Sequence, residues 1–466
     1  MRLILFLILA GVVIPAKSEP VTLQVSPDRR HLQRADGTPF FYLGDTAWEL
    51  FHRLNREEAD LYLEDRAKKG FTVIQAVALA ELDGLNTPNA YGHRPLLNND
   101  PTRPDLKDGP HNDYWDHVDY IVSQAAARGL FIGLLPTWGD KWQPQAADTS
   151  RVIFNADKAR RYGEWLGRRY ANQPIIWILG GDRNIHSEAD RTVVEAMAQG
   201  LRKGDGGQHL MTYHPSGPGL SSDYFHHADW LDFNMFQSSH AARDHDNGLY
   251  ARHDYDLRPA KPTLDGEPRY ESIPVGFYLK DMPRHIRFDD CDARQAAYWS
   301  LLAGACGHTY GNNNVWQMWA PGRSPAISAN IPWPQALDHP GAFQMGHLRR
   351  LFESRPFSKL VPNDDFIKDG PTRGGAKVRG ALASDGSFAF IYSPRGEPFS
   401  VDLHSLPGPR VRQAWFDPRY GVTCELHTGD NRGVQTYTPP TTGRGQDWLL
   451  ILDDGDRKFP LPGATH

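Results

Sequence analysis

Residues 175–184 read IIWILGGDRN, which is five apolar residues followed by two glycines, an acid, a base and an amide. A short continuous apolar run is typical of a strand that is buried on both faces, as in a parallel sheet. Asp182 follows this run after the two glycines, at the carboxyl end where parallel α/β folds collect their functional side chains. The stretch therefore predicts a buried strand that carries a carboxylate to one rim of a sheet.

Similar runs occur on both sides of this strand, separated by amphipathic segments that have helix start and stop signals. They span residues 39–48, 71–79, 130–139, 209–215, 231–239, 262–267 and 307–313. Strands that alternate with helices in this number are the pattern of an α/β (β/α)8 TIM barrel, and we predict that fold. The alternative is an open doubly wound sheet, but its nucleotide-binding form lacks support because no glycine-rich phosphate-binding motif follows any strand.

The two ends of the chain differ from the barrel pattern. Beyond about residue 350, short alternating strands with turn pairs such as Asp-Gly predict a small C-terminal antiparallel β-sandwich. We assign residues 19–355 to the barrel with an N-terminal β extension and residues 356–466 to the sandwich. Residues 21–40 are expected to form a hairpin on the floor or side of the barrel. The sandwich is expected to pack against the barrel, because no cluster of aromatic residues marks it as a sugar binder.

Residues 1–18 have the features of a secretory signal peptide. Arg2 precedes an apolar stretch from Leu3 to Ile14, and the small-x-small triplet Ala16-Lys17-Ser18 follows. About 12 apolar residues are too few to span a bilayer comfortably. We therefore expect a periplasmic or extracellular protein with no membrane attachment after cleavage.

Composition places the chain among soluble globular proteins, since 40% of its 466 residues are hydrophobic and 23% are charged. The formal charge of −5, from 51 basic and 56 acidic residues, indicates no nucleic-acid partner. The oligomeric state is left open. The three cysteines do not form a disulfide framework. A Cys291–Cys306 bridge is disfavoured because the two residues lie at opposite ends of a predicted helix.

Two carboxylates stand out at the predicted rim, Asp182 after the fourth strand and Glu267 after the seventh. These strands face each other across a closed barrel, so the two acids can flank one bond. Glycoside hydrolysis needs such a pair, with one acid protonated and the other ionised. The structural alternative has Asp182 capping a helix beside Arg183 and Glu267 pairing with Arg269.

Other rim residues are candidates for holding a sugar, because polar groups can bond its hydroxyls and aromatic rings can pack on its faces. The candidates are Asp45, Trp48, Gln75, Trp138, His214, Asn234, Gln237, Arg269, Asn312, Trp316 and Trp319. We expect no metal and no cofactor. The crowded histidines lack the spacing of a zinc motif and are interpreted as surface or substrate-contacting groups: His226, His227, His240, His245 and His253.

Three motifs of the chain carry a resemblance to a known family, and they are GTPFFYLGDTAW, IIWILGGDRN and PTLDGEPRYE. In these motifs and in their order the chain resembles the apiosidase-like glycoside hydrolases, glycoside hydrolase family 140. The similarity runs from about residue 24 to the C-terminus. It implies a barrel with a C-terminal β-sandwich once named for collagen binding. It also implies a retaining mechanism, with Asp182 as acid/base and Glu267 as nucleophile, that acts on apiosyl linkages of plant glycans or glycosides. In the wider clan the first acid is usually a Glu after Asn, whereas here an Asp follows Gly.

Three other functions remain alternatives. The first is a glycosidase of the same fold with a different sugar specificity. The second is a non-catalytic carbohydrate-binding protein, which the presence of both acids disfavours. The third is a secreted peptidase that grips collagen, and the absence of a zinc motif or a G-x-S-x-G nucleophile elbow disfavours it.

Overall fold

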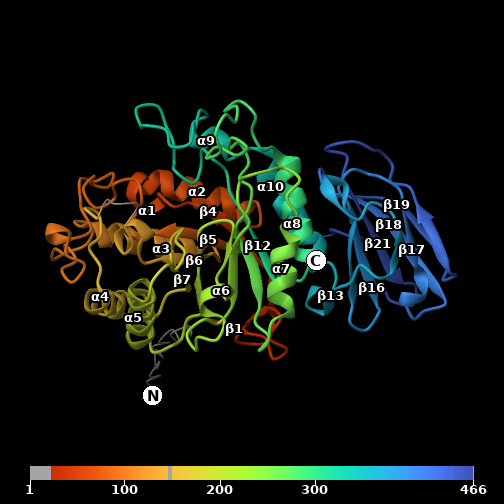
Figure 1. Ribbon diagram of the computed structural model, residues 1–466, viewed down its shortest axis with the longest axis horizontal. Coiled ribbons are helices and arrows are strands. Elements are labelled where there is room, and N and C mark those ends of the chain that lie inside the picture. Colours follow the sequence, from red (N-terminus) through yellow and green to blue (C-terminus); the bar gives the residue numbers. More distant parts are fainter. Residues whose placement is uncertain (1–21, 145–148, 465–466) are drawn as a thin grey trace, which may run out of the picture.

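A computed structural model of the chain describes residues 22–144 and 149–464 (Figure 1). The predicted signal peptide lies outside these residues. A nine-stranded, mostly parallel sheet curls into a TIM-like barrel, as predicted. Its strands are β4 (Tyr42–Thr46), β5 (Val73–Val77), β6 (Phe131–Leu135), β7 (Ile175–Leu179), β8 (Met211–Tyr213), β9 (Gly219–Leu220), β10 (Asn234–Gln237), β11 (Thr263–Glu267) and β12 (Gly307–Tyr310).

The sheet differs from a fully closed barrel at one edge. The strand order is β8-β7-β6-β5-β4-β12-β11-β10-β9, so no ladder joins β8 to β10 among the described residues. A backbone hydrogen bond from Asp232, just before β10, to the Met211 carbonyl of β8 (2.9 Å) links the two edges instead. The extra strand β9 pairs with β10 in the antiparallel direction.

Helices cover the outside of the sheet. They are α1 (Leu50–Arg53), α2 (Arg56–Lys68), α3 (Tyr114–Ala127), α4 (Ala156–Tyr170), α5 (Glu188–Asp205), α6 (Ser222–Phe225), α7 (Gly248–Asp256), α8 (Asp290–Leu302), α9 (Trp333–Ala336) and α10 (Pro340–Glu353). A helix long and apolar enough to cross a membrane does not occur in the described segments. Cys291 and Cys306 are free thiols in the structure.

The N-terminal extension closes the floor of the barrel. It forms a three-stranded antiparallel sheet, β1 (Leu23–Val25), β2 (Leu32–Arg34) and β3 (Pro39–Phe40), one strand more than the predicted hairpin. Phe40 packs edge-on against Phe131 at the start of β6, with ring centroids 5.2 Å apart. The amino ends of the strands are therefore covered, and the carboxyl ends stay available for a site.

The C-terminal region is an antiparallel sandwich, as predicted. A six-stranded sheet, β13-β15-β16-β21-β18-β19, faces a three-stranded sheet, β14-β17-β20. The strands are β13 (Leu360–Pro362), β14 (Ile367–Asp369), β15 (Arg379–Ala383), β16 (Phe388–Ser393), β17 (Phe399–Asp402), β18 (Arg410–Asp417), β19 (Val422–Asp430), β20 (Val434–Tyr437) and β21 (Trp448–Asp454).

The larger sheet buries both of its faces. Along β16, Ala389 and Ile391 belong to the core between the two sheets. The alternate residues Phe388, Phe390 and Tyr392 belong to the core shared with α8 and α10. A strand with period-two side chains and apolar residues on both faces therefore joins the sandwich to the barrel, with these two helices between them (Figure 1).

Buried ion pairs reinforce this interface. Arg294 of α8 donates two hydrogen bonds to Asp447, from Nε to Oδ2 (2.9 Å) and from Nη2 to Oδ1 (2.7 Å). The exposed fraction is 1% for Arg294 and 0% for Asp447. Two charged groups in such a position depend on each other, because removing one partner leaves the other charge buried and unpaired.

The variant Arg294→Ala is expected to lower the free energy of unfolding by about 3–5 kcal/mol. Urea titration followed by tryptophan fluorescence measures this loss. The matched control is Arg252→Ala, because Arg252 forms an exposed pair with Asp256 and should cost less than about 1 kcal/mol. Equal unfolding midpoints for the two variants would contradict the larger stabilisation that we assign to the buried pair.

Candidate active site

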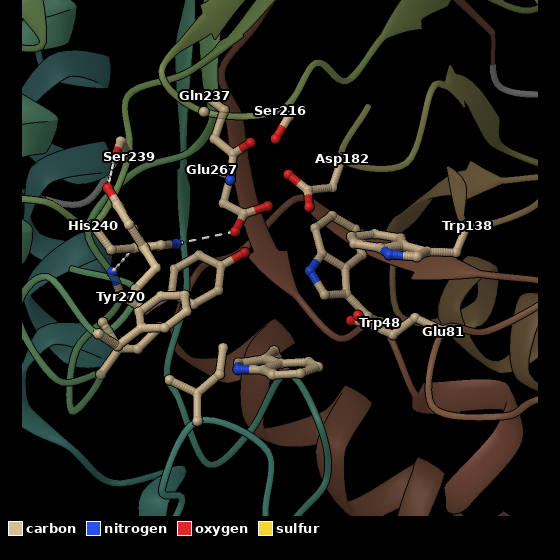
Figure 2. Close-up of a pocket in the computed structure, with 16 residues that line it drawn as sticks. Trp48, Glu81, Trp138, Asp182, Ser216, Gln237, Ser239, His240, Glu267 and Tyr270 are labelled. Carbon is tan, nitrogen blue, oxygen red and sulfur yellow. Dashed lines mark hydrogen bonds and ion pairs between the residues drawn. The ribbon is translucent and has the colours of Figure 1, made fainter. Parts of the chain in front are cut away.

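A cavity of about 310 Å³ opens at the carboxyl ends of the barrel strands. Six residues singled out in the sequence line it: Trp48, Trp138, Asp182, Gln237, Glu267 and Trp316. Figure 2 shows the carboxyl groups of Asp182 and Glu267 pointing toward each other across it. The structure therefore brings together the two acids that come from opposite strands of the barrel.

Asp182 reaches the cavity through an unusual backbone turn at the end of β7. Gly180, Gly181 and Asp182 have φ values of 96°, 71° and 60°, all in the left-handed region. Glycine adopts this region freely, and Asp is among the few other residues that tolerate it. The two glycines reverse the chain and so turn the carboxylate inward. A strained aspartate held by its surroundings is a feature of functional sites.

The same glycines have no room for a side chain. A Cβ on Gly180 would lie 2.3 Å from the His214 carbonyl oxygen, and one on Gly181 would lie 2.8 Å from the Gly139 nitrogen. Both neighbours are backbone atoms, so they cannot rotate away. The turn that positions Asp182 is therefore packed tightly against the two adjacent strand ends.

The variant Gly180→Ala is expected to reduce activity by about 10²-fold, because displacing this turn misplaces the Asp182 carboxyl. Initial rates of glycoside hydrolysis measure the loss. Gly37→Ala is the matched control, since Gly37 has a φ of 85° and a Cβ added there would meet no atom within 4 Å. Gly37→Ala has the backbone strain of a side chain at positive φ but no steric clash, and it should keep full activity. Equal activities for both variants would show that the turn does not position the acid.

Glu267 reaches the cavity through a β-bulge. Phe236 of β10 pairs with Asp265, but the next residue, Gln237, pairs with Glu267, so Gly266 is an extra residue on β11. Asp265 points toward the helices, where it accepts a hydrogen bond from Asn247 (3.0 Å). Strict alternation would point Glu267 the same way. The bulge changes this direction and turns Glu267 into the barrel mouth.

Two histidines lie against the Glu267 carboxylate, His240 in a hydrogen bond and His214 in a close approach. His240 Nε2 lies 3.1 Å from Oε1, and His214 Nε2 lies 3.1 Å from Oε2. The Nδ1 atom of His214 accepts the Asp182 backbone N–H (3.2 Å). An Nδ1 atom that accepts must leave the proton on Nε2, which faces Glu267. His214 therefore links the backbone of one acid to the carboxylate of the other.

The surroundings push the two acids toward opposite protonation states. Burial and the negative charge of Glu267 raise the pKa of Asp182 to about 6. Burial also disfavours the charged form of Glu267, but contacts with His214 and His240 outweigh it and lower the pKa of Glu267 to about 2. Between these values Asp182 carries a proton while Glu267 is ionised. Such a pair can supply one proton donor and one anionic nucleophile.

The structural alternative for the two acids is not supported. Helix α5 begins at a capping box made by Ser187 and Asp190, so Asp182 does not cap it. Arg183 does lie 3.6 Å from Asp182 Oδ2. Arg269, the proposed partner of Glu267, instead donates to the Arg243 carbonyl.

Two sugar-binding predictions on the barrel strands are wrong. Asp45 points outward, where its Oδ2 accepts hydrogen bonds from Arg66 Nε and from the Tyr62 hydroxyl, each 2.6 Å long. Gln75 points inward but lies within the packed barrel, bonded to the Tyr42 hydroxyl and the Gly266 carbonyl, each at 3.0 Å. Both side chains have an exposed fraction of 0%, so neither can touch a ligand in the cavity.

The remaining predictions that fail do so for similar reasons. Asn234 faces the helices and bonds His226 Nδ1 (3.2 Å), and Asn312 bonds His339 Nδ1 (2.8 Å). Arg269 is turned toward α8, where its guanidinium lies over the Trp299 ring. Trp319 lies outside the cavity with its indole bonded to Arg323. His214 does not line the cavity and contacts Glu267 in place of a sugar.

His240, one of the histidines interpreted as surface or substrate-contacting groups, lines the cavity. Its other lining residues were not singled out in the sequence, and they are Glu81, Ser216, Gly217, Ser239, Tyr270, Ile273, Phe277, Tyr278 and Ile327. Most lie in loops after strand ends, and no spacing rule predicts the course of such loops. Over residues 22–144 and 149–464, no group of three or more His, Cys, Asp and Glu side chains is arranged to hold a metal ion.

Known proteins share this architecture. Residues 26–359 match the family model described as "Apiosidase-like, catalytic domain", and residues 361–453 match "Putative collagen-binding domain of a collagenase". A solved structure described as a glycoside hydrolase is 34% identical, with a TM-score of 0.85 over 94% of this chain and 98% of that one. A glycoside hydrolase family 5 structure from Bacteroides vulgatus is 31% identical, with a TM-score of 0.86 over 95% and 96%. No curated protein matches the chain.

Proposed function

The chain belongs to the apiosidase-like family of glycoside hydrolases, and we propose that it cleaves an apiosyl or similar furanosyl linkage with retention of anomeric configuration. Asp182 is the acid/base and Glu267 the nucleophile. The observation that carries this proposal is the pair of facing carboxyls whose pKa values are driven apart, Asp182 upward and Glu267 downward. Hydrolysis of a glycosidic bond requires this division of protonation states.

In the first step Glu267 attacks the anomeric carbon and forms an ester as the bond to the leaving oxygen breaks. Asp182 gives its proton to that oxygen, and the leaving group departs as an alcohol. In the second step the Asp182 carboxylate takes a proton from water, and that water attacks the anomeric carbon. The ester breaks, the sugar leaves, and Glu267 is ionised again. His214 and His240 keep the carboxylate oriented between the steps.

Activity is expected to fall as the pH rises above about 6, because the raised pKa of Asp182 means that its proton is lost there. Glu267 has a lowered pKa and stays ionised down to about pH 2, so acid inactivation by this group comes much later. Values of kcat/KM between pH 3 and pH 9 measure the alkaline limb, and the rate should stay on its plateau at the acid end of this range. In Asp182→Asn the alkaline limb should disappear. A wild-type rate that stays constant up to pH 8 would contradict the assigned acid.

The substrate is tested by release of free sugar from a panel of apiosides, arabinofuranosides, galactosides and pectin fragments. We expect the apiosides to be cleaved fastest. Cleavage of another glycoside class in their place would favour the second candidate, a glycosidase of the same fold with a different sugar. Binding of these glycans without cleavage of any would contradict the proposed catalysis.

We also propose that the chain is exported from the cytoplasm. The charged start, short apolar stretch and small-residue triplet of residues 1–18 support this. N-terminal sequencing of the protein recovered from the periplasm or medium should find a start close to residue 19. Recovery in the cytoplasm with an intact Met1 would contradict export.

A further inference from the structure

The cavity holds a third carboxyl group, Glu81, which the proposed mechanism does not use. Glu81 follows β5 and lines the same cavity as Asp182 and Glu267. Figure 2 shows it on the side formed by Trp48 and Trp138. These two indoles lie with ring centroids 5.4 Å apart and form an aromatic wall beside it. Its position is therefore next to the surface on which a sugar ring would pack.

Glu81 differs from the acids around it because it has no partner. Four neighbouring carboxylates act on it, and burial together with their charge raises the pKa of Glu81 well above its ordinary value. Each of the four contacts a basic side chain: Glu49 with His52 at 2.5 Å, Asp140 with Lys141 at 2.7 Å, Asp182 with Arg183 at 3.6 Å, and Glu267 with His240 at 3.1 Å. In the described part of the chain, the Glu81 carboxyl has no hydrogen bond or ion pair.

A carboxyl group without a protein partner retains its full capacity to accept hydrogen bonds. In a cavity of a glycoside hydrolase, sugar hydroxyls are the donors that can meet this need. A side chain that only stabilised the fold would be expected to have a partner among its neighbours, as Glu49 does with His52.

The charge around Glu81 also restricts which sugar can enter. The described residues that line the cavity include three carboxyls and no Arg or Lys. A sugar that carries its own carboxylate would place it beside the ionised Glu267, in a cavity whose described lining offers no lysine or arginine to pair with it. An uncharged sugar meets hydroxyl, amide and carboxyl groups that can bond its hydroxyls, together with aromatic faces.

We propose that Glu81 is a specificity-determining residue that binds hydroxyl groups of the sugar in this cavity, and that the cavity, which has no lysine or arginine among the described residues of its lining, selects uncharged sugars over uronic acids. This inference rests on the proposed function, because it assumes that the cavity holds the sugar. Glu81 acts in recognition, whereas bond cleavage belongs to Asp182 and Glu267. Free monosaccharides therefore test it separately from catalysis.

The experiment measures dissociation constants of apiose, arabinose, galactose and galacturonate by titration calorimetry. It compares the wild-type protein with Glu81→Ala, Glu81→Gln and the control Glu188→Ala, since Glu188 is 83% exposed on α5. The wild-type protein should bind galacturonate at least about tenfold more weakly than galactose. Glu81→Ala should weaken neutral-sugar binding about 3–10-fold, the range for a hydrogen bond between neutral groups.

Glu81→Gln keeps the shape and an acceptor oxygen, so neutral-sugar binding should return to within a few-fold of wild type. The preference for galactose over galacturonate should persist in the same variant, because it depends on the ionised Glu267 and on the absence of a lysine or arginine from the described part of the lining. Wild-type sugar affinity in Glu81→Ala would overturn this inference alone. If no neutral sugar binds the wild-type protein, the assignment of the cavity to a sugar fails, and this inference fails with it. Thermal unfolding of each variant identifies any that has not folded.

Discussion

Replacing Glu267 with Ala or Gln is expected to lower kcat/KM by at least about 10⁴-fold, because the nucleophile and the bond it forms are both removed. Gln matches the side chain in size, so its effect isolates the loss of charge. Two histidines contact the Glu267 oxygens at 3.1 Å, and a neutral amide cannot use both contacts in the same way. Initial rates on the best substrate of the panel measure the loss.

Chemical rescue distinguishes loss of the nucleophile from loss of the fold. Azide added to Glu267→Ala should fill the space of the missing carboxylate and attack the anomeric carbon directly. The product is then a glycosyl azide of inverted configuration. The matched control is Glu188→Ala, which should keep its wild-type rate. A Glu267→Ala protein that retains more than about one hundredth of the wild-type activity would rule out this nucleophile.

Replacing Asp182 with Ala or Asn is expected to have an effect that depends on the leaving group. A glycoside with an alcohol as leaving group needs the proton, and its hydrolysis should fall by about 10²–10⁴-fold. A nitrophenolate leaves without protonation, so the rate at which a nitrophenyl glycoside forms the covalent intermediate should be nearly unchanged. The raised pKa of Asp182 and the backbone turn that aims it at Glu267 are the grounds for this expectation.

The informative quantity is the loss of activity on the glycoside with an alcohol leaving group, divided by the loss on the nitrophenyl glycoside. In Asp182→Ala, azide should also speed release of the covalent intermediate, because the base for water is missing and azide needs none. An equal loss on both leaving groups would mean that Asp182 positions the substrate and transfers no proton. Comparison with Gly180→Ala, which keeps the carboxyl but displaces it, separates position from chemistry.

The acids can be predicted from sequence because their signals are local. Residues 175–184 contain the strand, both glycines and Asp182 within one stretch, so the turn can be predicted without knowledge of the fold. The place of Glu267 after the seventh strand is predictable on the same ground. Its orientation is not, because it depends on the bulge at Gly266, and a bulge arises only when two strands are paired.

Three of the residues that are predicted wrongly, Asp45, Gln75 and Asn234, lie on strands buried on both faces. In such strands every position is apolar or buried, so the sequence does not reveal which side chains face the barrel interior. The outward direction of Asp45 and Asn234 is not predicted for this reason. Each points toward the helices and is hydrogen-bonded there. Glu81 escapes prediction because it lies in a loop whose path depends on contacts with distant parts of the chain.

The interface between barrel and sandwich shows the same limit. Alternating strands predict the sandwich, and both faces of β16 are apolar in the sequence. Which face meets the barrel is decided by long-range contacts such as that between Arg294 and Asp447, which lie 153 residues apart. A pairing of this kind leaves no local pattern. The fold class is therefore accessible from sequence, while the packing of its two parts is not.

The central claim is that Asp182 and Glu267 act as a retaining pair. Proton NMR of the first sugar released from the best substrate tests it most directly, because spectra taken within minutes precede mutarotation. We expect the anomer formed first to have the configuration of the substrate, since two inversions restore it. A product that first appears with inverted configuration would mean that water attacks directly, with Glu267 as a base, and would contradict the covalent mechanism.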